Sequence, residues 1–78
     1  MPKLRKQLGK YDKLLVLING RMKIDNVSME QLAGYMGVSR NTATARLNAP
    51  ENITLKELGA ISRGLGIPIE ELRAAIPN

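Results

Sequence analysis

The sequence contains no cysteine, histidine, tryptophan or phenylalanine. Without cysteine there is neither a disulfide nor a thiol nucleophile, and without histidine the chain lacks imidazole acid–base chemistry and the commonest metal ligand. The carboxylates of Asp25, Glu30 and Glu51 are isolated in sequence, so no pair of them is placed for general acid–base catalysis. We therefore predict that the protein is not an enzyme and that it uses no metal, no cofactor and no small-molecule ligand.

Long apolar runs are also missing. The apolar run over residues 14–18 is five residues long, whereas a membrane-spanning helix needs about 20 apolar residues and a signal-peptide core about 7–15. We therefore expect no membrane partner. The absence of cysteine is compatible with a reducing compartment, and we expect a cytoplasmic protein.

Aromatic residues make up only 3% of the chain, although 44% of its residues are hydrophobic. The core must therefore be aliphatic, and without alternating β-branched runs it favours helices over a sheet. Helical spacing predicts five helices, over residues 10–24, 29–36, 40–47 and 55–65 and in a short segment after Pro68. A chain of 78 residues supports one core. We predict one all-α domain over residues 10–78, preceded by a flexible basic arm over residues 1–9.

Apolar residues at helical spacing indicate which faces point inward. In the first helix the stripe consists of Tyr11, Leu14, Leu15, Ile18 and Met22. Val16 falls on the opposite side of that helix. In the fourth and fifth helices we expect the buried residues to be Leu55, Leu58, Ile61 or Ser62, Leu65, Leu72 and Ile76.

The region from Ser28 to Asn48 contains two short helical patterns that meet at one glycine. Ser28 and Gln31 form a capping box, a pair that Thr54 and Glu57 repeat before the fourth helix. Gly37 tolerates the positive φ that ends a helix, and the following Ser39 is a helix N-cap. The second pattern carries residues such as Asn41, Thr42 and Thr44, whose side chains form hydrogen bonds, at positions where a purely structural helix usually carries Glu, Lys or Ala. This is the outline of a helix-turn-helix that binds DNA.

The positive charge is concentrated in the same part of the chain. The net charge is +5, but residues 1–50 carry +6 and residues 51–78 carry −1. A polyanionic partner is the natural interpretation of this asymmetry. The alternative is that a small basic protein carries its charge for solubility alone.

Two groups of residues resemble a known family when taken together in this order and spacing. The first group is Leu32-Ala33, Gly37-Val38-Ser39, Arg40 and Thr42, and the second is Leu55, Leu58, Leu65-Gly66-Ile67 and Glu71-Leu72. They are similar to the Cro/CI-type (XRE-like) helix-turn-helix domains of phage repressors and bacterial regulators. A phage-associated branch is indicated by Arg46-Leu47-Asn48-Ala49-Pro50 followed by Thr54-Leu55-Lys56-Glu57-Leu58.

The resemblance implies a five-helix lambda-repressor-like bundle that binds a double-stranded DNA operator as a homodimer. Its third helix would lie in the major groove, and its second helix would place its N-terminus on the phosphate backbone. By position, the groove-facing residues would be Ser39, Arg40, Asn41, Thr44, Ala45 and Asn48. The candidates for contacts with DNA phosphates are Lys3, Arg5, Lys6, Ser28, Gln31 and Arg46. Structural roles would fall to Ala33, Gly37, Val38, Ala43 and Leu47.

Several of these residues have two interpretations. Arg40 suits a guanine edge or a phosphate, and Asn41 suits an adenine edge or simply the start of its helix. Arg46 either reaches a phosphate or pairs with Glu51 or Glu57. The basic arm either contacts DNA or is only a solvated terminus. Met29 departs from the family pattern, because many members carry Gln at that position.

We therefore expect a Cro-like repressor from a phage or mobile element, without an effector domain, that acts by occupying its operator. The alternative is a protein-interaction module on the same fold, such as an antitoxin-like or host-inhibiting small phage protein. For a dimer contact the exposed apolar candidates are Val16, Ile69 and Ile76.

Overall fold

The computed structural model describes residues 9–77, and the regular secondary structure in that range is all helical, with no strand. The elements are α1 (Asp12–Asp25), α2 (Met29–Met36), α3 (Arg40–Asn48), the 3-10 turn η2 (Pro50–Asn52), α4 (Leu55–Leu65) and α5 (Ile69–Ala74). The all-α prediction is confirmed. Lys3, Arg5 and Lys6 of the basic arm lie outside the described residues.

Local capping explains where the helices begin and end. Ser28 Oγ accepts the Gln31 N–H at 3.1 Å while Gln31 Oε1 accepts the Ser28 N–H at 2.8 Å. The same reciprocal pair joins Thr54 and Glu57 before α4, so both predicted capping boxes are confirmed. Gly37 ends α2 with φ 74° and thus makes the predicted turn. At the end of α1 the left-handed position is taken by Asn26, which the sequence did not single out.

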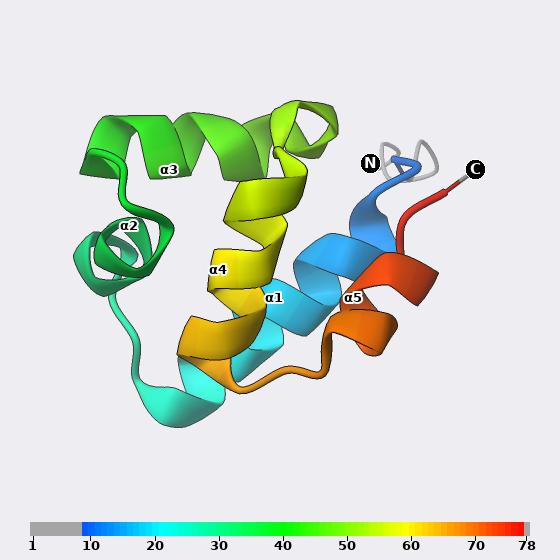
Figure 1. Ribbon diagram of the computed structural model, residues 1–78, viewed down its shortest axis with the longest axis horizontal. Helices are drawn as coiled ribbons and strands as arrows, with labels where there is room; N and C mark the ends of the chain where they lie inside the picture. Colours follow the sequence, from blue (N-terminus) through cyan, green and yellow to red (C-terminus); the bar gives the residue numbers. More distant parts are fainter. Residues whose placement is uncertain (1–8, 78) are drawn as a thin grey trace, which may run out of the picture.

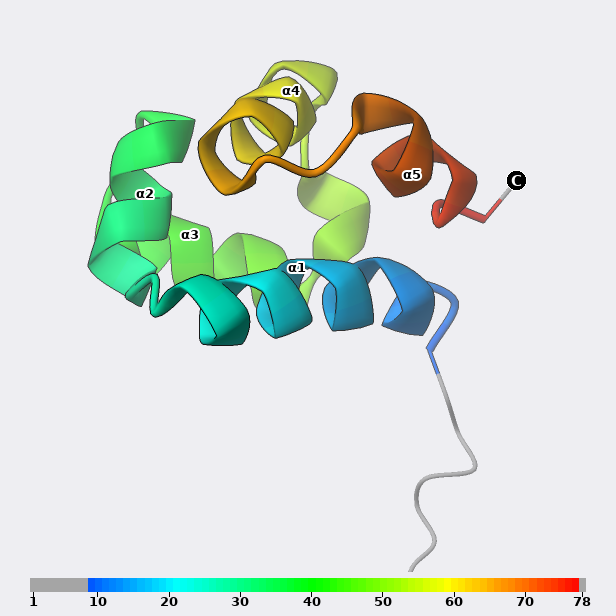
Figure 2. The same ribbon diagram turned by 90° about the horizontal axis from the view of Figure 1, so that it is seen from below.

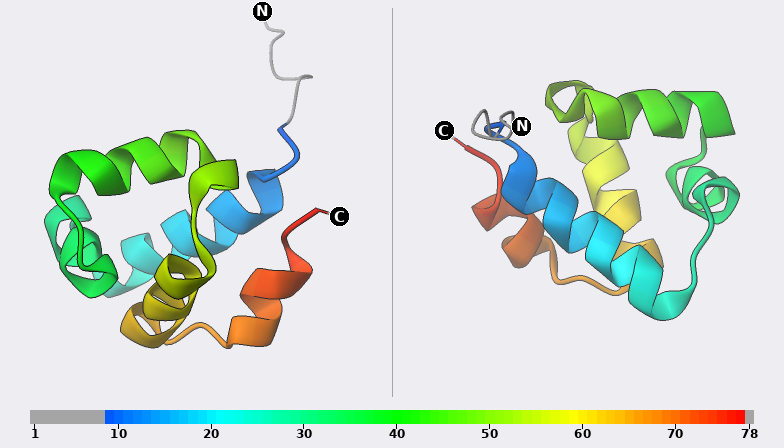
Figure 3. Two further views of the ribbon diagram at one scale, coloured as in Figure 1. Left: turned by 45° about the horizontal axis from the view of Figure 1, so that its top comes forward. Right: turned by 180° about the vertical axis from the view of Figure 1, so that it is seen from behind.

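The helices enclose one aliphatic core (Figure 1). α4 runs through the middle of the molecule, with α2 and α3 on one side of it and α1 and α5 on the other, as the two views of Figure 3 also show. The largest fully buried side chains come from α1, α2, α4 and α5, and they are Leu14, Ile18, Leu32, Ile61 and Leu72. Ala43 and Leu47 of α3 are buried in the same core, so all five α-helices of the described chain contribute to it.

Two expectations about the core were wrong or incomplete. Leu55 is 81% exposed, because it is the first residue of α4 and lies outside the face that Leu58, Ile61 and Leu65 present to the core. Ile61 rather than Ser62 fills the interior. The Ser62 hydroxyl instead donates to the carbonyl oxygen of Ile67 at 2.6 Å, which ties the end of α4 to the segment leading into α5.

One glycine allows α2 to pack closely on α4. A β-carbon added at Gly64 would lie 2.5 Å from the ring of Tyr35, well inside van der Waals contact. Only a residue without a side chain therefore fits opposite Tyr35. This contact holds α2, and with it the turn and α3, against the core.

Candidate nucleic-acid interface

The α2–turn–α3 unit has the geometry of a helix-turn-helix. After Gly37 the N–H of Val38 donates to the carbonyl of Ala33 at 3.0 Å, which closes the turn. Ser39 then caps α3 by accepting the N–H of Thr42 at 3.1 Å, and its own hydroxyl donates to Thr42 Oγ1 at 3.0 Å. These local bonds place α3 along one edge of the molecule, where nothing else in the described chain covers its outer side (Figure 1).

α3 has one buried side and one exposed side. Ala43 and Leu47 are buried against the core, as the sequence predicted. The exposed residues on α3 and at its cap are all six of the predicted groove-facing residues, namely Ser39, Arg40, Asn41, Thr44, Ala45 and Asn48. In α3 itself these residues follow the spacing i, i+1, i+4, i+5, i+8, so they share one side of the helix. We call these six residues the recognition face.

The recognition face is polar and carries no acidic residue. Its charged group is Arg40, and its hydrogen-bonding groups are those of Ser39, Asn41, Thr44 and Asn48. Such side chains offer donors and acceptors to base edges without repelling phosphate. Within residues 9–77 no cluster of three carboxylates lies close enough to hold a metal ion.

The beginning of α2 is exposed and carries the two predicted phosphate contacts Ser28 and Gln31. In their capping box Ser28 Oγ and Gln31 Oε1 both act as acceptors, which leaves the Ser28 hydroxyl proton and the Gln31 amide protons free to donate. The first N–H groups of a helix also attract anions. This end of α2 therefore has donors for a phosphate although Met29 replaces the Gln that many family members carry.

Arg46 does not belong to the exposed side of α3. Its Nε donates to Glu57 Oε1 at 3.0 Å, and the two side chains are largely buried together. The same carboxylate oxygen accepts the N–H of Thr54 at 3.1 Å. Of the two predicted ion-pair partners, Glu57 is confirmed. The pairing with Glu51 is wrong, because the exposed Glu51 makes no ion pair in the part of the chain that the structure describes.

The environment of Glu57 favours its charged form. Burial by itself would raise the pKa of this carboxyl, since only 8% of the residue is exposed. The Thr54 N–H and the Arg46 guanidinium outweigh burial, and the pKa of Glu57 is held below its ordinary value of 4.5. The Arg46–Glu57 pair therefore stays ionised at neutral pH.

The first described residues of the chain lie near the end of α3. A hollow of about 530 Å³ is lined by Gly9, Lys10 and Tyr11 on one side and by Asn48, Pro50 and Glu51 on the other. The chain therefore enters α1 beside the C-terminal end of the recognition face. Sequence reasoning had no signal for this proximity, because these two segments are far apart in the chain.

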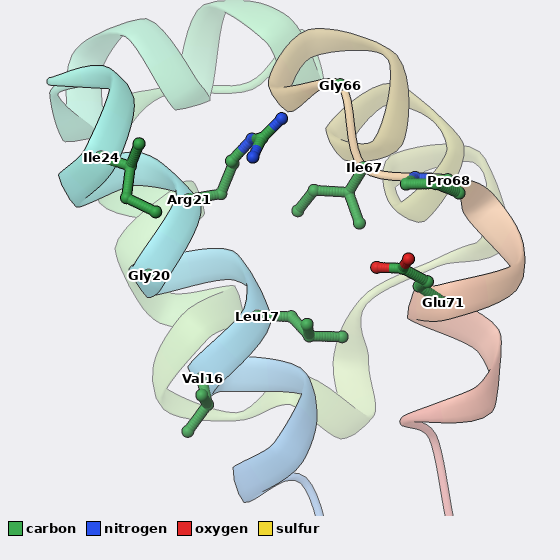
Figure 4. A pocket seen from close by; sticks show the side chains of 9 residues that line it. All are labelled: Val16, Leu17, Gly20, Arg21, Ile24, Gly66, Ile67, Pro68 and Glu71. Atoms are coloured by element: carbon green, nitrogen blue, oxygen red, sulfur yellow. The ribbon is translucent and has the colours of Figure 1, made fainter.

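A second hollow, of about 420 Å³, lies on the opposite side of the molecule. Figure 2 shows α1 and the connection between α4 and α5 in front, with α3 behind them. The hollow is lined by Val16 and Ile24 of α1, which are 69% and 75% exposed, and by Ile67, Pro68 and Glu71 across from them (Figure 4). Val16 was predicted to face outward, and Ile24 was not singled out.

Comparison with known proteins gives the same assignment as the geometry. A family model described as helix-turn-helix matches residues 21–72, two-thirds of the chain. The chain belongs to this XRE-type helix-turn-helix family. The match includes all of α2, α3 and α4. No curated protein and no solved structure matched the chain.

Family membership assigns the chain to DNA-binding domains of transcription regulators, whose partner is double-stranded DNA. Families of this kind are typically not enzymes. Among residues 9–77 no helix is long and apolar enough to cross a membrane.

Proposed function

We propose that this helix-turn-helix protein is a repressor of the Cro type, from a phage or mobile element, that binds a specific operator and blocks access to it. The observation that carries the proposal is the recognition face on α3, which is exposed, polar and free of acidic residues. A helix of this kind fits the major groove of B-DNA. Repression would then be steric, since an occupied operator excludes polymerase or a competing regulator.

Each residue of the recognition face has a defined task in this proposal. Arg40 donates two hydrogen bonds to a guanine edge, and Asn41 pairs with an adenine edge. Thr44 and Ala45 offer methyl groups to thymine. Ser39 and Asn48 lie at the two ends of α3, where they approach the phosphate backbone.

Phosphates are bound beside the recognition face. Ser28 and Gln31 supply donors at the start of α2, where the helix dipole adds to the attraction. Lys10 lines the same hollow as Asn48 and Glu51, and the basic residues Lys3, Arg5 and Lys6 precede it in the sequence. We propose that these side chains add salt-dependent, sequence-independent affinity.

The decisive experiment is selection of binding sites from a random-sequence duplex pool by the purified protein. We expect a consensus site, and Arg40→Ala with Asn41→Ala should lose discrimination at individual base pairs of that site. Arg73→Ala is a matched control, because it removes an exposed arginine from α5, away from α3. If no duplex is bound even at low salt, the proposal fails.

We further propose that the protein binds its operator as a homodimer. Of the predicted dimer residues, Ile69 and Ile76 prove to be half-buried and packed against the core, so they offer little free surface. Val16 is exposed but lies in the hollow on the side away from α3. A dimer formed there would turn the two recognition faces away from each other.

Leu55 is a better dimer residue. It stands exposed beside a hollow of about 220 Å³ that Pro50, Ile53 and Leu58 help to line. In a two-fold dimer Leu55 of each copy would enter the hollow of the other, close to the C-terminal ends of both α3 helices. Leu55→Glu should leave the fold intact and abolish the dimer in sedimentation analysis with operator DNA, whereas Val16→Glu should not. The opposite result would move the dimer contact to α1.

The hollow between α1 and α5 favours a second candidate function, a protein-interaction module on the same fold. Its exposed Val16 and Ile24 are apolar groups that DNA recognition does not use. The two functions separate experimentally. If the protein acts by binding DNA, Arg40→Ala abolishes its biological effect and Ile24→Glu preserves it. If it acts by binding a protein partner in the hollow, Ile24→Glu abolishes the effect and Arg40→Ala preserves it.

A further inference from the structure

α3 is held to the rest of the protein in two different ways along its length. Buried Ala43 and Leu47 join it to the apolar core. Near its C-terminal end the connection is polar, because Arg46 Nε donates to Glu57 Oε1 in the first turn of α4. Within residues 9–77 this is the one side-chain hydrogen bond that joins α3 to another helix.

Glu57 couples this contact to the beginning of α4. One oxygen atom, Oε1, accepts both the Arg46 guanidinium at 3.0 Å and the Thr54 N–H at 3.1 Å. Thr54 Oγ1 in turn accepts the Glu57 N–H at 3.0 Å. Glu57 thus has very little freedom to move, and Arg46 is anchored to a rigid point. A planar guanidinium held in this way fixes direction as well as distance.

We propose that Arg46 is a positioning residue, which holds the C-terminal half of α3 at the angle needed for base discrimination through its bond to Glu57. This proposal rests on the DNA-binding function proposed above and deepens it. Thr44 and Ala45 of the recognition face lie within two residues of Arg46 along α3. A small rotation of this half would displace them from base edges, whereas contacts at the start of α2 and α3 would remain.

If Arg46 instead contacted a phosphate directly, its substitution and that of Glu57 would have different effects. A phosphate ligand adds about one unit to the slope of log affinity against log salt, and neutralising a nearby carboxylate would leave that contact intact or strengthen it. A positioning residue depends on its partner. Neutralising Glu57 should then weaken discrimination although it removes a negative charge from a DNA-binding protein.

The test compares Glu57→Gln and Arg46→Gln with the unaltered protein. Glu57→Gln keeps an oxygen acceptor for the Thr54 N–H while it removes the charge that holds Arg46. Glu51→Gln is the matched control, since it makes the same charge change at an exposed residue in the turn between α3 and α4. Circular dichroism at rising temperature identifies a temperature at which all four proteins are folded, and binding is measured there.

The probes are the duplex recovered by site selection and a random-sequence duplex of equal length. We expect both Glu57→Gln and Arg46→Gln to reduce the ratio of specific to random-duplex affinity by about tenfold, comparable with one mismatched base pair. Random-duplex affinity and its salt slope should stay within error of the unaltered protein, and Glu51→Gln should keep the full ratio.

Two results would overturn the proposal. If Glu57→Gln keeps the full ratio while Arg46→Gln lowers affinity for both duplexes and reduces the salt slope, Arg46 is a phosphate ligand. If neither variant changes the ratio, the ion pair serves stability alone. Failure of the unaltered protein to select any duplex would instead refute the DNA-binding function itself, so the two failures are distinguishable. Should Glu57→Gln not fold, Arg46→Lys, which keeps the charge but lacks the Nε donor, tests the same geometry.

Discussion

The starts of α2 and α4 carry the same capping motif in two different environments. In both, a hydroxyl accepts the N–H of the third helical residue, and the side chain of that residue accepts the N–H of the cap. Gln31 of the first motif is neutral and exposed, whereas Glu57 of the second is charged and buried. The first motif leaves the Ser28 hydroxyl proton and the Gln31 amide protons free to donate to a ligand. In the second motif Glu57 Oε1 also accepts a hydrogen bond from Arg46.

The same capping motif can therefore have two roles, one in ligand binding and one in holding helices together. A helix start that faces solvent can offer its spare donors to phosphate. A buried carboxylate such as that of Glu57 needs hydrogen-bond partners, since an unpaired buried polar group is costly. No buried side-chain nitrogen or oxygen lacks a partner anywhere between residues 9 and 77. Four predictions test the contrast, from the largest expected effect to the smallest.

The largest effect is expected for Glu57→Ala. This substitution leaves the Arg46 guanidinium, largely buried, without its partner and removes one half of the α4 cap. Breaking a buried pair by removing one member typically costs about 3–5 kcal/mol, and the partial exposure of Arg46 places the loss near 3. Urea unfolding followed by circular dichroism measures it. A loss below about 1 kcal/mol, the usual value of an exposed pair, would contradict the buried role of Glu57.

Acidification should remove part of the same stabilisation without a mutation. Because the pKa of Glu57 is lower in the folded protein than its ordinary value of 4.5, the charged carboxylate stabilises the fold above that pH. This contribution is lost as the pH falls from about 4.5 through the lowered value. The free energy of unfolding of the unaltered protein and of Glu57→Gln, measured from about pH 6 to about pH 3, should therefore converge. Parallel curves would show that Glu57 does not titrate differently in the fold.

Removal of the cap hydroxyls should have similar and smaller effects at the two sites. Ser28→Ala and Thr54→Ala each delete one side-chain acceptor, which typically costs about 1 kcal/mol. We expect Thr54→Ala to cost slightly more, since Glu57 then loses part of its orientation towards Arg46. Thermal unfolding of the two variants side by side measures the difference. A larger loss of stability for Ser28→Ala than for Thr54→Ala would contradict the proposed coupling of the Thr54 cap to the Arg46–Glu57 pair.

The smallest effect on stability is expected for Gln31→Ala, whose side chain is exposed and neutral. We expect about 0.5 kcal/mol or less in urea unfolding, together with weaker binding to every duplex regardless of sequence. Gel-shift titration with random duplex measures the second effect, and Glu30→Ala, one position earlier on the exposed first turn of α2, is the control. Unchanged duplex affinity would remove Gln31 from the phosphate contacts.

The sequence was sufficient to locate the recognition unit. Ser28, Gly37 and Ser39 mark helix ends through bonds to residues only three to five positions away, and these bonds form wherever the helix starts or stops. Which side of α3 is exposed, with Ala43 and Leu47 facing inward, followed from the family resemblance rather than from local bonds. The same resemblance supplied the expectation that this exposed side faces DNA.

Residues at helix ends were predicted less well. Leu55 was expected among the buried residues of α4 but lies exposed, because it is the first residue of the helix and lies outside the face that Leu58, Ile61 and Leu65 present to the core. Ile69 was predicted to be exposed, and Ile76 was predicted both to face inward and to offer apolar surface to a dimer; both are half-buried at the edge of the core. Periodicity gives the side of a helix on which a residue lies, and it does not give how far along the helix the neighbouring elements extend.

The sequence by itself thus determined the helices, the turn at Gly37 and the polar character of α3, because each depends on residues close together in the chain. Only the tertiary structure decided that Arg46 pairs with Glu57 rather than Glu51, that Lys10 lies beside the end of α3, and that Val16 and Ile24 frame a hollow on the far side. These relations depend on the angles at which helices cross. Crossing angles follow from the packing of the whole core, which no single segment specifies.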